Sequence, residues 1–256
     1  MAELAEANRK VAFITGGSFG IGAAVAFALA RDGFDVAVTG TRIENVAGTC
    51  AKLDALRVRS HAVALDVRSP ESIDAALASV LSALGRIDVL VNNAGIPLAK
   101  PALEITPAEW ENVVATNLNG TFYMTQAFGR YLTGNKREGQ IINIGSTHGL
   151  VGYAGRSAYG TSKAAVHQLT RMLAIEWAPL GIRVNAVAPG RVESNSPARA
   201  KTSSDPKVLE ASRKRVPLDR FCSVEDVAEA VRYLASPGAA YITGHTLVLD
   251  GGLTVA

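Results

Sequence analysis

Apolar residues along the chain fall into short, β-branched runs that alternate with longer segments of helical periodicity. A near-continuous apolar run of about four to eight residues is typical of a strand in a parallel sheet that is covered on both faces. The pattern therefore predicts seven buried strands, and their ranges are 10–15, 35–40, 60–67, 87–95, 140–146, 182–189 and 245–252.

The segments between these runs carry recognisable helix starts. Ser69 offers an N-cap before Pro70, and capping boxes begin at Thr106 and Ser223. Repeated strand–helix alternation predicts a doubly wound α/β fold, with a seven-stranded parallel sheet and helices on both faces. The chain shows no internal repeat and no linker-like break, so residues 1–256 are expected to form a single domain.

One segment departs from the alternation. Residues 190–220 are polar, and from 191 to 220 eight Lys and Arg residues stand against four acids. A long loop with a short helix inside a compact domain is usually functional, so we expect a substrate lid here. The alternative is a solvated insertion without a role.

The composition is that of a soluble globular protein, with 48% apolar residues, 19% charged residues and a net charge of +3. No basic tract carries interleaved aromatic residues, which argues against a nucleic-acid partner. Cys50 and Cys222 stand far apart without a histidine cluster, so we expect reduced thiols and no metal site. No segment approaches the roughly 20 apolar residues of a membrane span, and no signal peptide is evident, so no membrane association and a cytoplasmic location are expected.

A glycine-rich turn, "TGGSFGIG" (15–22), follows the first predicted strand and opens a helix. Gly16, Gly20 and Gly22 permit a tight turn and let the backbone approach a pyrophosphate at the helix N-terminus. Glycine also serves ordinary turns and helix packing, but the strand–turn–helix context favours a dinucleotide-binding Rossmann fold.

The end of the second strand predicts the type of dinucleotide. An acid at this position would bind the ribose 2′-hydroxyl of NAD, whereas a basic residue favours the 2′-phosphate of NADP. This chain has Thr41 and Arg42, and an arginine fork matches a phosphate. The alternative is an ordinary surface arginine at a helix start.

A tyrosine and a lysine stand four residues apart in "AYGTSKAAV" (158–166), so Tyr159 and Lys163 project from one helix face. An ammonium about 4–5 Å from the phenol oxygen favours phenolate by up to about 4 kcal/mol at an effective dielectric near 20. That corresponds to a tyrosine pKa lowered by about two to three units, toward the range in which general acid–base catalysis works best. The pair is therefore interpreted as a tuned acid, with a purely structural pair as the alternative.

With these motifs in place, the chain resembles the short-chain dehydrogenase/reductase family over essentially its whole length. Ser146 precedes Tyr159 by thirteen residues, the separation usual in that family. The residues that carry the resemblance are Thr15, Gly16, Gly20, Gly22, Asp66, Asn92, Asn93, Ala94, Gly95, Asn117, Ser146, Tyr159, Lys163, Pro189 and Gly190.

The resemblance implies roles for these residues. Tyr159 is expected to protonate the substrate carbonyl oxygen, Ser146 to hydrogen-bond it, Lys163 to hold the nicotinamide ribose and Asn117 to anchor a water in a proton relay. The substrate pocket is expected to include Ser146, His148, Tyr153 and Tyr159. The residues expected to contact the cofactor are Gly16, Ser18, Phe19, Gly20, Ile21, Gly22, Thr41, Arg42, Asp66, Val67, Asn93, Ala94, Gly95, Tyr159, Lys163, Pro189, Gly190, Val192 and Ser194.

The chain departs from the family pattern at two cofactor positions. Phe19 stands where many NADP-using relatives have a basic residue, which leaves the 2′-phosphate to Arg42 and Thr41. Ser194 replaces the usual threonine and keeps the hydroxyl.

The amino-acid sequences of these motifs are most similar to those of the 3-oxoacyl-carrier-protein reductases of fatty acid biosynthesis. Arg130 matches one basic position that docks the acidic carrier in those enzymes, but Ile175 stands at the other. We therefore expect NADPH-dependent reduction of a 3-oxoacyl thioester of carrier protein or CoA. Reduction of another small ketone or sugar alcohol and a non-catalytic NADP sensor remain as alternatives. A nucleotide-sugar epimerase would typically need a larger C-terminal domain.

Family resemblance also implies a homo-oligomer, with a tetramer expected. Leu169, Leu173 and Trp177 recur at helical spacing and are candidates for an exposed interface stripe. The alternative is that this stripe faces the protein's own sheet.

Overall fold

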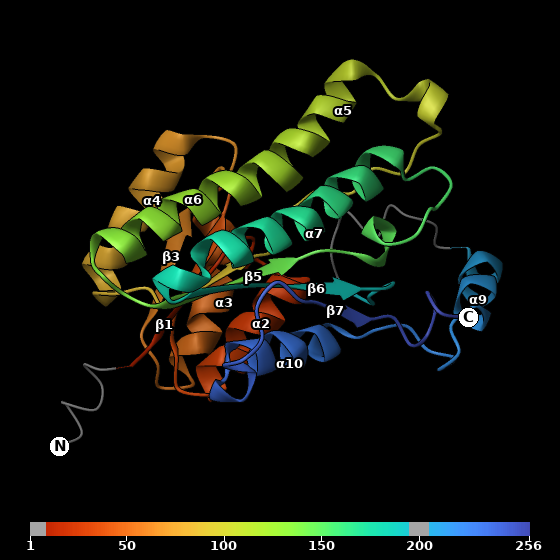
Figure 1. Cartoon of the computed structure of the whole chain (residues 1–256). Coiled ribbons are helices and arrows are strands. Elements are labelled where there is room, and N and C mark those ends of the chain that lie inside the picture. The colour runs from red at the N-terminus through yellow and green to blue at the C-terminus, as the bar shows by residue number, and fades with distance from the viewer. Residues whose placement is uncertain (1–8, 195–204) are drawn as a thin grey trace.

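The computed structural model describes residues 9–194 and 205–256, and its centre is a seven-stranded parallel sheet (Figure 1). The strands lie in the order β3-β2-β1-β4-β5-β6-β7. Their bounds are β1 Val11–Ile14, β2 Asp35–Gly40, β3 Ser60–Ala64, β4 Val89–Asn92, β5 Gly139–Ile144, β6 Ile182–Pro189 and β7 Thr246–Leu249.

Helices cover both faces of the sheet, and each face has its own apolar core. One face packs against α2 (Gly20–Arg31), α3 (Glu44–Asp54) and α10 (Val224–Ala235). The other packs against α4 (Pro70–Leu84), α6 (Gly120–Gly134) and α7 (Ser157–Trp177), and α5 (Pro107–Val114) leads into α6. The predicted doubly wound α/β fold is thereby confirmed.

All seven predicted strands form, and the predicted helix starts are confirmed. The Ser69 hydroxyl accepts a hydrogen bond from the backbone of Ser72 at 3.1 Å, and reciprocal capping boxes begin α5 at Thr106 and α10 at Ser223. Several strands are shorter than their apolar runs. The last residues of five runs, 15, 65–67, 93–95, 145–146 and 250–252, lie in loops at the carboxyl edge of the sheet.

The strand order reverses between β1 and β4, because the chain crosses from β3 back over β2 and β1. In open α/β sheets, ligands bind at the carboxyl edge beside such a reversal. The loops after β1, β4 and β5 meet there, and α9 (Pro206–Lys214) lies beyond the ends of β6 and β7 (Figure 1).

The expectation of an exposed stripe on α7 is wrong. Leu173 is buried, while Leu169 and Trp177 pack against the core formed with α6. A Cβ at Gly129 on α6 would lie 2.8 Å from the Trp177 ring, so the two helices approach closely around this indole. The large apolar side chains that α7 exposes are Met172 and Ile175.

The segment predicted to act as a lid is described in part, and its role as a lid stays a prediction. Its short helix is α9, and residues 195–204 of the predicted 190–220 segment lie outside the described ranges. Among the described helices, none is both long and apolar enough to cross a membrane. The described residues also contain no cluster of three or more metal-ligating His, Cys, Asp or Glu side chains.

Candidate active site

The glycine-rich turn leaves the N-terminus of α2 open to an anion. Phe19 is the N-cap and offers no side-chain hydrogen bond, and the first turn holds no acid. The starts of α4, α5 and α10 are capped by a serine or threonine hydroxyl. The first N–H groups of α2 therefore have no side-chain partner among the described residues and, with the helix dipole, favour a phosphate.

The turn is also shaped by close backbone contacts. Gly16 and Gly20 have φ of +71° and +60°, which favour glycine. A Cβ at Gly22 would lie 2.2 Å from the carbonyl oxygen of Gly16. Asn93 fixes the turn from the end of β4, since its Nδ2 donates to Gly16 O at 2.8 Å and to Thr15 O at 3.0 Å. This rigid, uncapped cradle fits the pyrophosphate of a dinucleotide.

The end of β2 gathers hydroxyl groups and one cation. A Cβ at Gly40 would lie 3.2 Å from Ser18 Oγ, and Asn45 Nδ2 is 3.5 Å from Thr41 Oγ1. Arg42 is exposed, and none of the ion pairs among the described residues includes it. These donors fit a ribose phosphate.

Asp66, at the end of β3, is held by a residue that the sequence reasoning missed. Arg68 donates to both carboxylate oxygens, with Nη2 2.7 Å from Oδ2 and Nε 2.9 Å from Oδ1. This hydrogen bonding lowers the pKa of Asp66, so the carboxylate is fixed in its charged form. The intervening Val67 is buried and packs closely on Gly120. An arginine two residues after an aspartate in a loop has no distinctive sequence signal.

Asn117 lies in a π-helical segment, Ala115–Asn119, between α5 and α6. It is fully buried, and its Oδ1 accepts from Ile96 N at 2.8 Å. Its Nδ2 donates to Ile96 O and to Ser162 Oγ, both at 3.0 Å. Single π-helical turns frequently occur at functional sites. The side chain therefore joins the loop after β4 to α7, one residue before Lys163.

Lys163 is buried beside Tyr159. Its Nζ donates to Ile144 O at 2.7 Å and lies 5.9 Å from the centre of the Tyr159 ring. Burial lowers the pKa of Lys163 to about 8. An ammonium has three donors, and one is used by the Ile144 carbonyl. The remaining donors are available to the hydroxyls of a bound ribose near Gly95, whose Cβ would lie 3.5 Å from Nζ.

Ser146 is positioned by two histidines. Its Oγ accepts from the backbone N of His148 at 3.2 Å and lies 3.3 Å from His148 Nδ1. Behind the loop, the buried His167 faces the Ser146 backbone N through Nε2 at 3.4 Å. A Cβ at Gly145 would lie 2.1 Å from that nitrogen, so the loop fits directly against the ring. Nothing in the sequence pattern distinguished His167 from an ordinary core residue.

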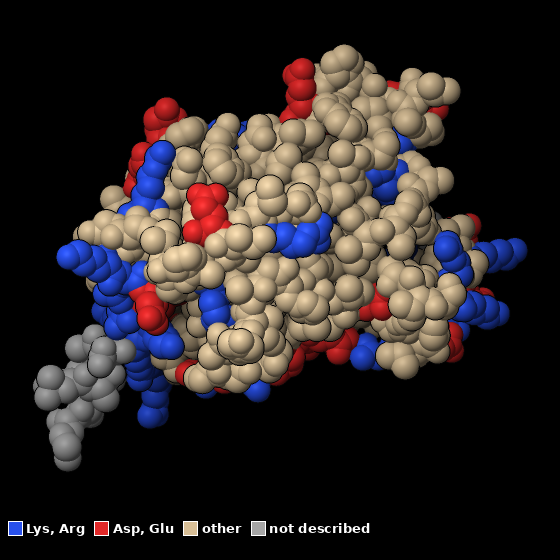
Figure 2. All heavy atoms as spheres, viewed as in Figure 1, with Lys and Arg blue, Asp and Glu red and all other residues tan. Residues whose placement is uncertain are grey.

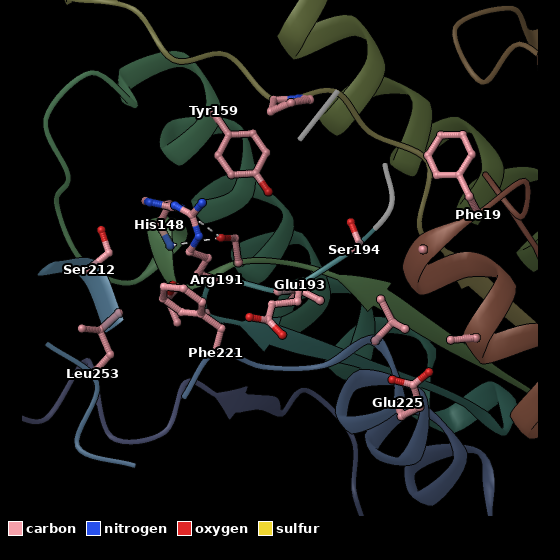
Figure 3. Close-up of a pocket in the computed structure, with 18 of the residues that line it drawn as sticks. Phe19, His148, Tyr159, Arg191, Glu193, Ser194, Ser212, Phe221, Glu225 and Leu253 are labelled. Carbon is pink, nitrogen blue, oxygen red and sulfur yellow. Dashed lines mark hydrogen bonds between the residues drawn. The ribbon is translucent and has the colours of Figure 1, made fainter. Parts of the chain in front are cut away.

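These residues surround one large pocket at the carboxyl edge, and Tyr159 and Ser194 point into it (Figure 3). The predicted site residues that line it are Ser18, Phe19, Gly20, Ser146, His148, Tyr153, Tyr159, Gly190, Val192 and Ser194. The other predicted residues support the pocket from behind or lie beyond its lining, and they are Gly16, Ile21, Gly22, Thr41, Arg42, Asp66, Val67, Asn93, Ala94, Gly95, Asn117, Lys163 and Pro189.

Comparison with known proteins gives matches over nearly the whole chain. A family model described as enoyl-(acyl carrier protein) reductase matches residues 16–254. The 3-oxoacyl-[acyl-carrier-protein] reductase of Vibrio cholerae is 40% identical, over 95% of this chain and 97% of that protein. The 3beta-hydroxysteroid dehydrogenase 1 of Eggerthella lenta is 36% identical, over 96% of this chain and 94% of that protein.

Solved structures agree with these matches. A putative short-chain alcohol dehydrogenase from Sinorhizobium meliloti has a TM-score of 0.90 at 37% identity, and the match covers 96% of this chain and 97% of that one. An NAD+-bound xylitol dehydrogenase has a TM-score of 0.89 at 30% identity, covering 95% of this chain and 98% of that one. The similar proteins share a fold, but their names point to different substrates.

Proposed function

Because this chain belongs to the short-chain dehydrogenase/reductase family and is an oxidoreductase, we propose that it reduces a ketone to a secondary alcohol with NADPH. The observation that carries the proposal is the buried Lys163 ammonium, 5.9 Å from the Tyr159 ring, beside a pocket that Ser146 also lines. NADPH supplies the hydride when bound. The protein's own task is to orient the carbonyl and to deliver a proton to its oxygen.

In this reaction Tyr159 donates its phenol proton to the carbonyl oxygen, and Ser146 hydrogen-bonds that same oxygen. The nearby Lys163 ammonium stabilises the phenolate that remains. His148 orients the Ser146 hydroxyl through the two contacts at 3.2 and 3.3 Å. Asn117 bridges the loop after β4 and α7, which supports a water relay to solvent from this side of the site.

The finer part of the proposal is a 3-oxoacyl thioester of carrier protein or CoA as substrate, in fatty acid biosynthesis in the cytoplasm. The Vibrio cholerae relative, named for this reaction, supports it. Arg130 is exposed on α6, where an acidic carrier would dock. We further propose one catalytic domain in which residues 190–220 act as a lid.

A second candidate is the reduction or oxidation of another small ketone or sugar alcohol. Two observations favour it. Ile175, at the second carrier-docking position, is 77% exposed and uncharged, and one similar structure is a xylitol dehydrogenase. Assays of NADPH oxidation with acetoacetyl thioesters and with a panel of small ketones distinguish the two candidates, and a protein that binds NADPH but oxidises it with none would be a sensor.

Replacing Tyr159 by phenylalanine tests the proposed chemistry. Tyr159→Phe keeps the ring but removes the proton, and loss of a general acid costs about 10²–10⁴-fold in kcat. NADPH binding, measured by fluorescence, should survive. Tyr233→Phe, at a tyrosine that is outside the pocket lining, serves as the control. A folded Tyr159→Phe protein with kcat reduced less than about tenfold would contradict the role of Tyr159.

A further inference from the structure

A continuous row of side chains leads from the Ser146 hydroxyl to Arg215. His148 Nδ1 lies 3.3 Å from Ser146 Oγ, and the His148 and Tyr153 rings meet edge-on with centroids 5.0 Å apart. The Arg215 guanidinium lies over the Tyr153 ring at 5.6 Å, with Nη1 3.5 Å from the Tyr153 hydroxyl. All four residues line the pocket. A substrate whose carbonyl contacts Ser146 can therefore extend along two aromatic rings to a cation.

Two further arginines, Arg156 and Arg191, line the pocket with Arg215, and the remaining cation of the lining is Lys52 on α3. The Arg191 guanidinium lies over the Phe221 ring at 5.1 Å. Stacking on an aromatic face holds a guanidinium in place without neutralising its charge, and it leaves the N–H edge open.

None of these three arginines is ion-paired with a carboxylate among the described residues. Other cations near Arg215 in the chain are ion-paired. Arg213 pairs with Asp219, and Lys214 pairs with Glu210 at 2.8 Å. Both lie immediately before Arg215 in the chain. The carboxylates of Asp219 and Glu210 are therefore paired with cations outside the pocket lining.

The acids that line the pocket leave this end unneutralised. Glu193 and Glu225 line the pocket, but neither is ion-paired with the three arginines among the described residues. In Figure 3 Glu193 lies in the middle of the view below Arg191, and Glu225 lies on the side of Ser194 and Phe19, whereas Ser212, from the helix that leads into Arg215, lies on the opposite side with His148. The rings of His148 and Tyr153 form one wall of the pocket, the His148–Tyr153 wall. The positive end of the pocket is therefore the end at which this wall reaches Arg215.

Taking the proposed ketone reduction as its basis, we propose that the substrate carries an anionic group, a carboxylate or a phosphate, which Arg215 binds at the far end of the His148–Tyr153 wall. A guanidinium fork donates two parallel hydrogen bonds to either group. The carbonyl then lies at Ser146 and Tyr159, and the anion lies beyond two ring widths. Arg215 thereby selects for charge and for the separation between carbonyl and anion.

Matched pairs of substrates test this assignment and separate the two sources of the anion. Straight-chain keto acids from acetoacetate to 7-oxooctanoate are compared with their methyl esters, and acetoacetyl-CoA is compared with the uncharged acetoacetyl-N-acetylcysteamine. For each pair, kcat/KM is measured by NADPH oxidation. A charge-assisted hydrogen bond corresponds to about ten- to a hundredfold in binding. In either the keto-acid series or the thioester pair, kcat/KM for the anionic substrate should therefore exceed that for its neutral counterpart at least about tenfold.

The variant Arg215→Gln should lower this preference at least tenfold, expressed as the ratio of kcat/KM for the anion to that for its ester. Arg215→Lys should restore part of it. Lys207→Gln removes one charge from α9 outside the pocket lining and should leave the ratio unchanged.

Equal rates for anionic and neutral members in every pair, or an unchanged ratio in Arg215→Gln, would overturn this assignment while leaving ketone reduction intact. A protein that reduces no ketone would overturn the proposed function and the assignment with it.

Discussion

Arg42 is the residue on which the choice of coenzyme depends. It is exposed at the end of β2 beside the Thr41 and Ser18 hydroxyls, and Phe19 offers no second charge. The 2′-phosphate of NADP carries close to two negative charges, which need a partner. Arg42→Ala should raise the KM for NADPH by about ten- to a hundredfold and change that for NADH little. Steady-state kinetics with both coenzymes measure this.

A double change extends the same prediction. Thr41→Asp combined with Arg42→Ala should favour NADH, because a carboxylate repels the phosphate and accepts hydrogen bonds from the ribose hydroxyls. Preference for NADH in the unmodified protein, or an unchanged NADPH KM in Arg42→Ala, would show that Arg42 does not bind the phosphate.

His167 should make the protein sensitive to acid. Burial lowers its pKa to about 4 from 6.5, so the unfolded state binds the proton more readily. Stability should then be complete above pH 6.5 and fall as pH decreases toward 4, by about 2 kcal/mol between pH 7 and pH 5. In His167→Gln this loss should be smaller by that amount. Urea unfolding at the two pH values measures it, and His245→Gln, at an exposed histidine, is the control.

An equal loss between pH 7 and pH 5 in the unmodified protein and in His167→Gln would show that the buried ring does not carry this sensitivity. Its Nδ1 has no hydrogen-bond partner among the described residues. This ring is therefore held by its fit against Gly145 and Gly149, and a protonated ring would lack a counter-charge.

At the scale of elements, the turn between β1 and α2 requires a glycine at position 22. Gly22→Ala places a Cβ within 2.2 Å of the Gly16 carbonyl oxygen, so the turn must open. We expect NADPH binding weaker by at least about tenfold and a lower Tm, because the helix N-terminus moves away from the phosphate. Isothermal calorimetry and thermal unfolding measure the two effects.

Gly134→Ala is the matched control for this change, because an added Cβ there meets nothing within 4 Å. It should leave NADPH binding unchanged. Equal affinity in Gly22→Ala and in the unmodified protein would show that the turn does not hold the pyrophosphate.

The helices and strands could be predicted from the sequence better than the side-chain contacts between the site residues. Strands and caps follow from local pattern, since a buried parallel strand and an N-cap each have a signature within a few residues. The contacts of Asp66 with Arg68 and of Ser146 with His167 do not, because they depend on loop conformation and on residues 21 positions apart. The same limit applies to the apolar face of α7 that consists of Leu169, Leu173 and Trp177, since its burial was not predicted. Helical spacing identifies an apolar face but not what covers it.

At the scale of the whole molecule, charge is unevenly placed. The face over α6 and α7 is largely uncharged, while Lys and Arg gather toward the two ends of the molecule (Figure 2). Met172 and Ile175 are the large apolar residues that α7 exposes, at 58% and 77% exposure. A second exposed apolar group, Tyr233, Tyr241 and Val248, lies on α10, β7 and the loop between them. Large exposed apolar patches commonly mark interfaces between proteins.

Two exposed apolar groups on one chain suit a homotetramer with two kinds of two-fold interface. We therefore expect a mass in solution of about four times the 26.7 kDa chain. Ile175→Glu places a charge in the exposed apolar group on α7, where burial without a partner is costly, and should yield dimers. Val208→Glu, at an exposed valine on α9, should leave the tetramer intact. Light scattering at micromolar concentration measures all three proteins, and a monomeric mass for the unmodified chain would contradict both interfaces at once.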